Sequence, residues 1–177
     1  CDDNNKITAD SFNYETQECE NMIDLKIFPE PFVVNGVYDS SNAFVFGKCG
    51  AKEQSAGMDV IDKMFLEEST TSTAGTVSQV IGYDILAEPE KRHNYNLIFV
   101  GGPCCNYLVK DIFGIGCLDW IDEFKKDESF IILTKNGEDK VALLVAGYTS
   151  DDTVATAEVL ANYEDYDLTG TNFLLKE

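Results

Sequence analysis

The fold is decided by one stretch, Asn96-Leu97-Ile98-Phe99-Val100-Gly101-Gly102, in which a short apolar run ends in two glycines. Two other stretches have the same form, Ala43-Phe44-Val45-Phe46-Gly47 and Leu144-Val145-Ala146-Gly147. A continuous apolar run of this length is typical of a strand that is buried on both faces. A glycine at its end permits a tight turn into the next element. We therefore expect three core strands of a parallel sheet.

Helical patterns follow each of these strands. Ser55 is placed to cap a helix after the first strand, and Pro103 suits the first turn of a helix over 106–113 after the second. Ser150, with two aspartates behind it, is placed to cap a third helix that reaches about Tyr163. Strands that alternate with helices in this way predict a largely parallel sheet covered on both faces.

A hairpin is expected between 130–133 and 141–146, two apolar runs that flank Asn136-Gly137. An Asn-Gly pair adopts the positive φ values of a two-residue turn without strain. The predicted fold class is therefore α/β with three layers: a mostly parallel sheet, helices on both of its faces, and an added antiparallel hairpin.

The chain is strongly acidic. Its 177 residues include 32 Asp and Glu against 13 Lys and Arg, which gives a formal net charge of −19. Such a surface repels phosphate backbones and anionic lipid headgroups, so we expect no nucleic-acid partner. No apolar run approaches the roughly 18 residues that a membrane-spanning helix needs, so we expect no membrane span. The length suits one domain.

Disulfides are expected at all six cysteines: Cys1, Cys19, Cys49, Cys104, Cys105 and Cys117. An even number of cysteines without a C-x-x-C pair suits an oxidising compartment better than a reduced cytosol. A chain that starts at Cys1 rather than at Met resembles a processed product. We therefore expect export.

The pairing of the cysteines stays open, because six cysteines allow many connectivities. One of them joins Cys1 to Cys19 and so restrains a polar N-terminal segment over 1–27. In that connectivity the remaining bridges join Cys49 to Cys104 or Cys105 and use Cys117. Two alternatives remain: a lipid on Cys1, and a reactive thiol at a helix N-terminus, where the helix dipole lowers the thiol pKa.

The sequence contains few candidate catalytic residues. His93 is the only histidine, and it stands in a polar stretch without a positioned partner, which favours a solvated loop residue. Asp151-Asp152, at a helix start, is explained by the helix dipole rather than by a catalytic pair. The glycine turns match neither G-x-G-x-x-G nor G-x-x-x-x-G-K-[ST]. We therefore expect no enzyme, and no phosphate site at Gly101-Gly102.

Calcium is the only cofactor that the sequence suggests. Asp2, Asp3 and Asp10 bring oxygen ligands together at the density of a calcium loop, although the glycine and the final glutamate of an EF-hand are missing. The alternative is an acidic terminus that is merely solvated.

Several stretches resemble archaeal S-layer proteins, the exported subunits of two-dimensional cell-surface lattices. The first is Phe28-Pro29-Glu30-Pro31-Phe32-Val33-Val34-Asn35-Gly36, followed by the strand at 43–47. The more specific ones are Asn96 to Asn106 and Val145 to Tyr163. The resemblance implies a single S-layer-like α/β domain over 28–177.

In this domain the halves 28–66 and 96–175 are joined by 67–95. Lattice-forming members of the family usually carry large insertions between the halves, so the short joining segment points to a minimal or detached domain. The resemblance carries over no catalytic residues. It implies a non-enzymatic structural domain at the cell surface, which associates with copies of itself or with other envelope proteins.

Other functions are left open beside this one. A lattice, a filament and a discrete oligomer are equally compatible with the resemblance. A small-ligand or cell-wall carbohydrate-binding module would use the glycine-turn edge of the sheet, where open α/β sheets bind ligands. A hydrolase or transferase is disfavoured, because no nucleophile, base and orienting residue can be assembled from these residues.

Overall fold

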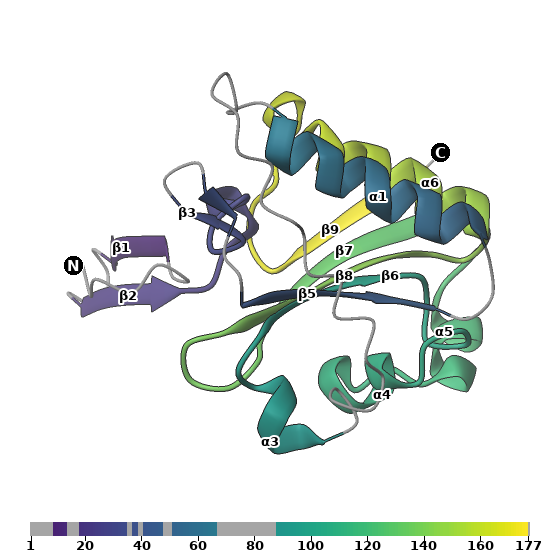
Figure 1. The fold of residues 1–177 in the computed structure, drawn as a ribbon, viewed down its shortest axis with the longest axis horizontal. Helices are drawn as coiled ribbons and strands as arrows, with labels where there is room; N and C mark the ends of the chain where they lie inside the picture. The colour runs from purple at the N-terminus through teal and green to yellow at the C-terminus, as the bar shows by residue number, and fades with distance from the viewer. Residues whose placement is uncertain are drawn as a thin grey trace.

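The computed structural model describes residues 9–13, 18–34, 37–38, 41–47, 51–66 and 88–176 (Figure 1). Most of the joining segment 67–95, namely 67–87, lies outside the described residues.

One five-stranded sheet forms the centre of the molecule, in the order β5-β6-β8-β7-β9. The strands are β5 (Asn42–Phe46), β6 (Asn96–Val100), β7 (Glu128–Lys135), β8 (Val141–Gly147) and β9 (Asn172–Lys176). β5, β6 and β8 run parallel to one another, and β7 is antiparallel to both of its neighbours. The three predicted core strands and the added hairpin are confirmed.

Helices cover both faces of this sheet, as Figure 1 shows. On one face α1 (Ala51–Leu66) and α6 (Ser150–Ala161) lie side by side. On the other face lie α3 (Pro89–Arg92), α4 (Leu108–Phe113) and α5 (Cys117–Glu123). The connections from β5 to β6 and from β8 to β9 both join parallel strands and cross the sheet in the same direction. Since such crossovers are right-handed, their helices α1 and α6 share a face.

The sheet separates two apolar cores, because side chains alternate between its faces. Phe44, Ile98 and Leu143 pack toward α1 and α6. Leu97 and Phe99 pack toward α4 and α5. All residues of β5, β6 and β8 are buried, which explains why these strands are apolar in the sequence apart from the buried Asn42 and Asn96 at the starts of β5 and β6.

The N-terminal part adds two small sheets, β1 (Ala9–Asn13) with β2 (Glu18–Met22), and β3 (Val33–Val34) with β4 (Val37–Tyr38). Between them, η1 (Leu25–Ile27) attaches the chain to the main core. Leu25 is fully buried, and its N–H donates to the carbonyl of Gly170 at 2.7 Å. The Gly170 N–H donates in turn to Asp24 Oδ1 at 2.8 Å. The end of the segment 1–27 is therefore packed on the domain.

The predicted two-residue hairpin turn is wrong. The last pair of the β7–β8 ladder is Lys135 with Val141, so residues 136–140 form a five-residue connection. Asn136 is buried, and its Nδ2 donates to the carbonyls of Arg92 and Tyr95 at 2.9 and 2.8 Å. Its amide therefore holds the segment that leads into β6, which is a non-local role.

Two predicted helix starts are also misplaced. α1 begins at Ala51, so Ser55 lies inside the helix and does not cap it. α4 begins at Leu108, so Pro103 lies in a turn before the helix. No helix within the described ranges is long and apolar enough to cross a membrane.

Candidate functional site

The carboxyl ends of β5, β6 and β8 meet along one side of the sheet, as expected for parallel strands. Gly47, Gly101, Gly102 and Gly147 lie there, and we call this side the glycine edge. The Gly47 N–H donates to the Val100 carbonyl at 3.3 Å, and the Gly101 N–H donates to the Val145 carbonyl at 2.9 Å. This is the position at which open α/β sheets commonly bind ligands.

At β8, the first turn of α6 closes directly onto the glycine edge. The Gly147 N–H donates to Thr153 Oγ1 at 2.9 Å, and the same hydroxyl donates to the Thr149 carbonyl at 3.0 Å. A Cβ on Gly147 would stand 2.5 Å from both the Asp152 carbonyl carbon and the Thr153 nitrogen. Such distances leave room for a hydrogen only, so this glycine is required by the packing of the helix.

A capping box closes the N-terminus of α6. The Thr149 N–H donates to Asp152 Oδ2 at 2.8 Å, and the Asp152 N–H donates to Thr149 Oγ1 at 3.2 Å. The cap is therefore Thr149 rather than the expected Ser150, because the hydroxyl and the third residue after it form the reciprocal pair. Asp152 is 7% exposed and serves the helix end, in line with the structural interpretation of this acidic pair.

Asp151 has a different position. It is exposed, and it forms an ion pair with Lys52 of α1 at 2.7 Å. Its hydrogen bond and its charge raise the pKa of Lys52. The pair joins the starts of α1 and α6 at the surface, where solvent screens it.

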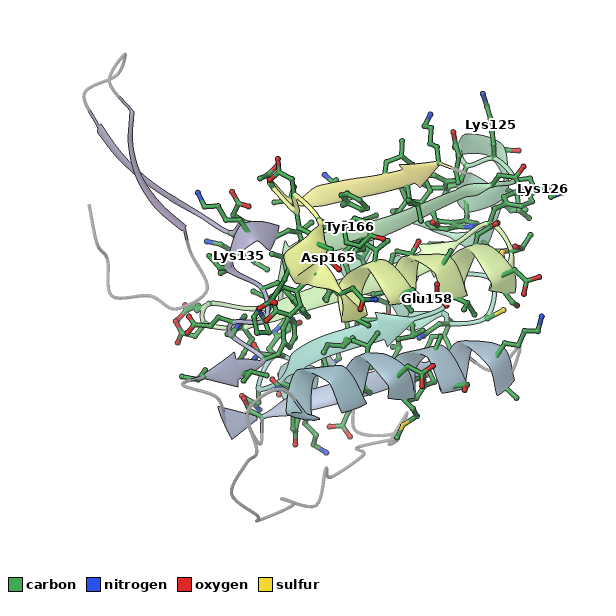
Figure 2. All side chains as sticks on the ribbon, turned by 90° about the horizontal axis from the view of Figure 1, so that it is seen from above. Lys125, Lys126, Lys135, Glu158, Asp165 and Tyr166 are labelled. Carbon is green, nitrogen blue, oxygen red and sulfur yellow. A yellow bond between two sulfur atoms is a disulfide. The ribbon has the colours of Figure 1, made fainter. Side chains whose placement is uncertain are left out.

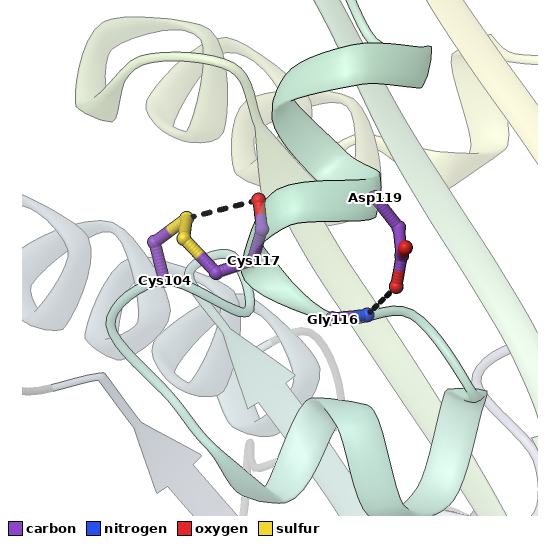
Figure 3. Close-up of a disulfide and its surroundings, with 4 residues drawn as sticks. All are labelled: Cys104, Gly116, Cys117 and Asp119. Carbon is purple, nitrogen blue, oxygen red and sulfur yellow. Dashed lines mark hydrogen bonds between the residues drawn. A yellow bond between two sulfur atoms is a disulfide. The ribbon is translucent and has the colours of Figure 1, made fainter.

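At β6, a disulfide holds the second glycine turn to α5 (Figure 3). Cys104 is bonded to Cys117, the first residue of α5. Next to it, the Gly116 N–H donates to Asp119 Oδ2 at 2.9 Å, as Figure 3 shows. The helix end is thus fixed by one covalent bond and closed by its own carboxylate.

The disulfide decides part of the open pairing. Cys104 does not bridge to Cys49, because its partner is Cys117. Cys105 is disulfide-bonded as well, while Cys49 and Cys1 lie outside the described residues. Cys19 lies in β2 opposite Phe12. The alternative of a reactive thiol fails for the three cysteines beside the glycine edge, since all are in disulfides.

Trp120 fills the space beside Gly102. It is 3% exposed, and a Cβ on Gly102 would meet its indole at 3.6 Å, an ordinary contact. Its ring packs on Phe124 and Phe130, with ring centroids 4.2 and 5.7 Å away. Neither Trp120 nor α5 was predicted from the sequence. The single tryptophan of the chain, which follows Gly114 and Gly116 closely, could have pointed to both.

Some of the N–H donors that a phosphate could use here are engaged within the chain. Asp119 accepts from the N-terminus of α5, and Asp152 accepts from that of α6. A bound anion would compete with these carboxylates and be repelled by them. The geometry supports the interpretation that the glycines serve turns and close packing.

The remaining candidates lie elsewhere. His93 is exposed at the end of α3, which confirms a solvated position. Asp2 and Asp3 lie outside the described residues, and Asp10 lies in β1 opposite Asn21. Among the residues that the structure describes, no three or more His, Cys, Asp or Glu side chains gather to hold a metal.

Comparison of the chain with known protein families and with curated proteins finds no match.

Proposed function

We propose that this chain is an exported, non-enzymatic structural domain of the archaeal S-layer type, which acts through contacts with copies of itself or with other proteins of the cell envelope. Its resemblance to S-layer proteins over 28–66 and 96–175 suggests the class. The proposal is supported by one structural observation above all. At β6 and β8, the glycine edge, where an α/β sheet usually carries its chemistry, is occupied by the chain's own groups.

Three groups close this edge. Trp120 packs beside Gly102, while Asp119 and Asp152 accept the hydrogen bonds of two helix N-termini. Each is held in place by packing or by a short hydrogen bond, so opening the edge would expose apolar surface or leave donors unpaired. A rigid, filled edge suits a building block better than a catalyst that must admit a substrate.

The covalent chemistry supports export. The disulfide between Cys104 and Cys117 links two elements of one surface, and Cys105 is disulfide-bonded too. Disulfides persist in oxidising compartments and are rare in a reduced cytosol. They restrain a domain that must stay folded outside the cell.

The charge supports an assembly that depends on divalent cations. Copies with a net charge of −19 repel one another at low salt. The run Glu164-Asp165-Tyr166-Asp167 is fully on the surface, and Asp2, Asp3 and Asp10 are further candidate contributors. Carboxylates from facing copies can share calcium, which favours oxygen ligands.

We expect millimolar calcium to promote higher-order species more than sodium at matched ionic strength, because sodium only screens the charge. Sedimentation velocity on the purified chain, with calcium, with sodium and with calcium plus chelator, measures this. The chelator should reverse the association. A monomer in all three conditions would remove self-assembly of this domain.

A second function is favoured by two exposed aromatic residues beside the glycine edge. Tyr107 is 52% exposed and Tyr148, which follows Gly147, is 40% exposed. Exposed aromatic faces suit contact with sugar rings, so a cell-wall carbohydrate-binding module is the alternative. A chain that stays monomeric in the calcium experiment but is retained on cell-wall polymer would favour this function.

A further inference from the structure

The two edges of the central sheet differ. At one edge, every residue of β5 is buried, so that strand is covered within the molecule. At the other edge, β9 pairs only with β7 among the described strands, and its residues alternate between exposed and half-buried. Figure 2, which looks onto α1 and α6, shows β9 along the outer margin of the sheet. An open edge strand is a template for a further strand.

The register shows which backbone groups of β9 are free to pair. The Leu133 N–H donates to the Thr171 carbonyl at 2.8 Å. In an antiparallel ladder the bonded pairs alternate, so Phe173 and Leu175 are the next residues to bond to β7. The N–H and carbonyl groups of the intervening residues therefore point to the open edge: Asn172, Leu174 and Lys176.

The side chains along this edge are apolar at its centre. Leu174 is 44% exposed, and it lies opposite Phe130 of β7. Phe130 and Ile132, on the same face of β7, are only half-buried. On the other face, Phe173 and Leu175 pack at the margin of the core. A strand added to β9 would cover apolar surface on both faces of the sheet.

The charge of β9 singles it out as a place where two acidic copies can approach. Residues 172–176 contain no carboxylate, in a chain whose net charge is −19. Lys176 is paired with Glu128 at 3.1 Å, and this hydrogen bond lowers the pKa of Glu128. Repulsion between copies is therefore smaller here than over an average stretch of the surface.

We propose that β9 is a docking strand for a second copy of this chain, which pairs antiparallel with it about a two-fold axis through Leu174. Leu174 then faces the Leu174 of the second copy. Phe173 faces Leu175 of the other copy, and Asn172 faces its Lys176, so apolar groups meet and no like charges are opposed. This register uses all three outward-pointing residues. It rests on the self-association in the proposed function and names the surface for it.

A charge exchange at Leu174 tests the register. Leu174→Lys and Leu174→Glu each place two like charges opposite each other on the axis, so each variant alone should associate at least about tenfold more weakly than the unchanged chain. A one-to-one mixture of the two variants should recover association as a mixed dimer. Sedimentation equilibrium in calcium measures the dissociation constants. Leu118→Lys, at an exposed leucine of α5, is the matched control and should leave association unchanged.

Leu174→Pro is a second variant that adds no charge. It removes an N–H that points away from β7, so the internal ladder stays intact while the outward one is interrupted. It should weaken association as strongly as Leu174→Lys, and thermal melting checks that each variant is folded.

The outcomes separate the two proposals. Association of the unchanged chain that none of the Leu174 variants weakens, or variants that do not recover on mixing, would overturn the β9 interface while self-association stands. An unchanged chain that is monomeric with and without calcium would overturn both. Association of the chain only with other envelope proteins would also reject the β9 dimer.

Discussion

Replacing Gly147 with alanine should lower the free energy of unfolding by about 3 kcal/mol or more. The new Cβ would overlap Asp152 and would stand 2.5 Å from the Thr153 nitrogen. These are backbone atoms and a Cβ in the first turn of α6, so no flexible side chain can move aside. The helix would have to lift from the sheet, and the hydrogen bond from Gly147 to Thr153 would lengthen.

Gly102→Ala is the matched control for this experiment. Gly102 lies on the same glycine edge, but a Cβ there makes only ordinary contacts, with the Trp120 ring at 3.6 Å and the Gly147 carbonyl oxygen at 3.9 Å. We expect its stability to stay within about 0.5 kcal/mol of the original chain. For Gly147→Ala, we expect the melting temperature to be lower by roughly 6–12 °C. Equal melting temperatures for both variants would contradict the close packing of α6.

Removing the disulfide with Cys104→Ala and Cys117→Ala should cost roughly 3 kcal/mol. The two cysteines are 13 residues apart, and in the chain-entropy model the bridge restrains the unfolded chain over a loop of this size. The loss should be concentrated near α5, because the bond fixes the start of that helix to the turn after β6.

Denaturant unfolding of the double variant measures this loss, and hydrogen exchange locates it. Leu118→Ala is the control, since Leu118 is 76% exposed on the same helix and should change stability by less than about 0.5 kcal/mol. A double variant as stable as the original chain would show that the disulfide does not stabilise the fold.

Much of the fold could be predicted because its central strands are apolar on both faces. Runs such as 96–100 have no polar side to interrupt them, so their position and their glycine turns can be read directly. β9 was not predicted, because its five residues alternate between half-buried and exposed and its partner is more than 35 residues away. Its pairing is decided by tertiary contacts rather than by its own pattern.

The position of the glycine edge could be predicted from the sequence, but the residues that cover it could not. That Gly47, Gly101 and Gly147 meet follows from parallel strands and is confirmed. What covers them depends on α5, whose seven residues are too short for a clear helical period, and on one of many disulfide pairings. Asn136 was misread for a related reason: a strong local turn signal hid its two hydrogen bonds to distant carbonyls.

The proposed function and the proposed β9 interface are consistent with each other, because both assign the molecule a role in protein contacts. Trp120, Asp119 and Asp152 occupy its glycine edge at β6 and β8, while among the described residues β9 is an open edge strand and 164–167 form an acidic surface. We therefore propose that the molecule acts through assembly.

Labelling of intact cells that make this protein tests whether the chain is exported and assembles at the cell surface. A membrane-impermeant, amine-reactive cross-linker reaches only proteins outside the cell, and exposed lysines such as Lys125 and Lys126 (Figure 2) are available to it. We expect the chain to be modified in intact cells and to be cross-linked to its own copies or to envelope proteins. A chain that is modified in a lysate but not in intact cells would contradict export and a role at the cell surface.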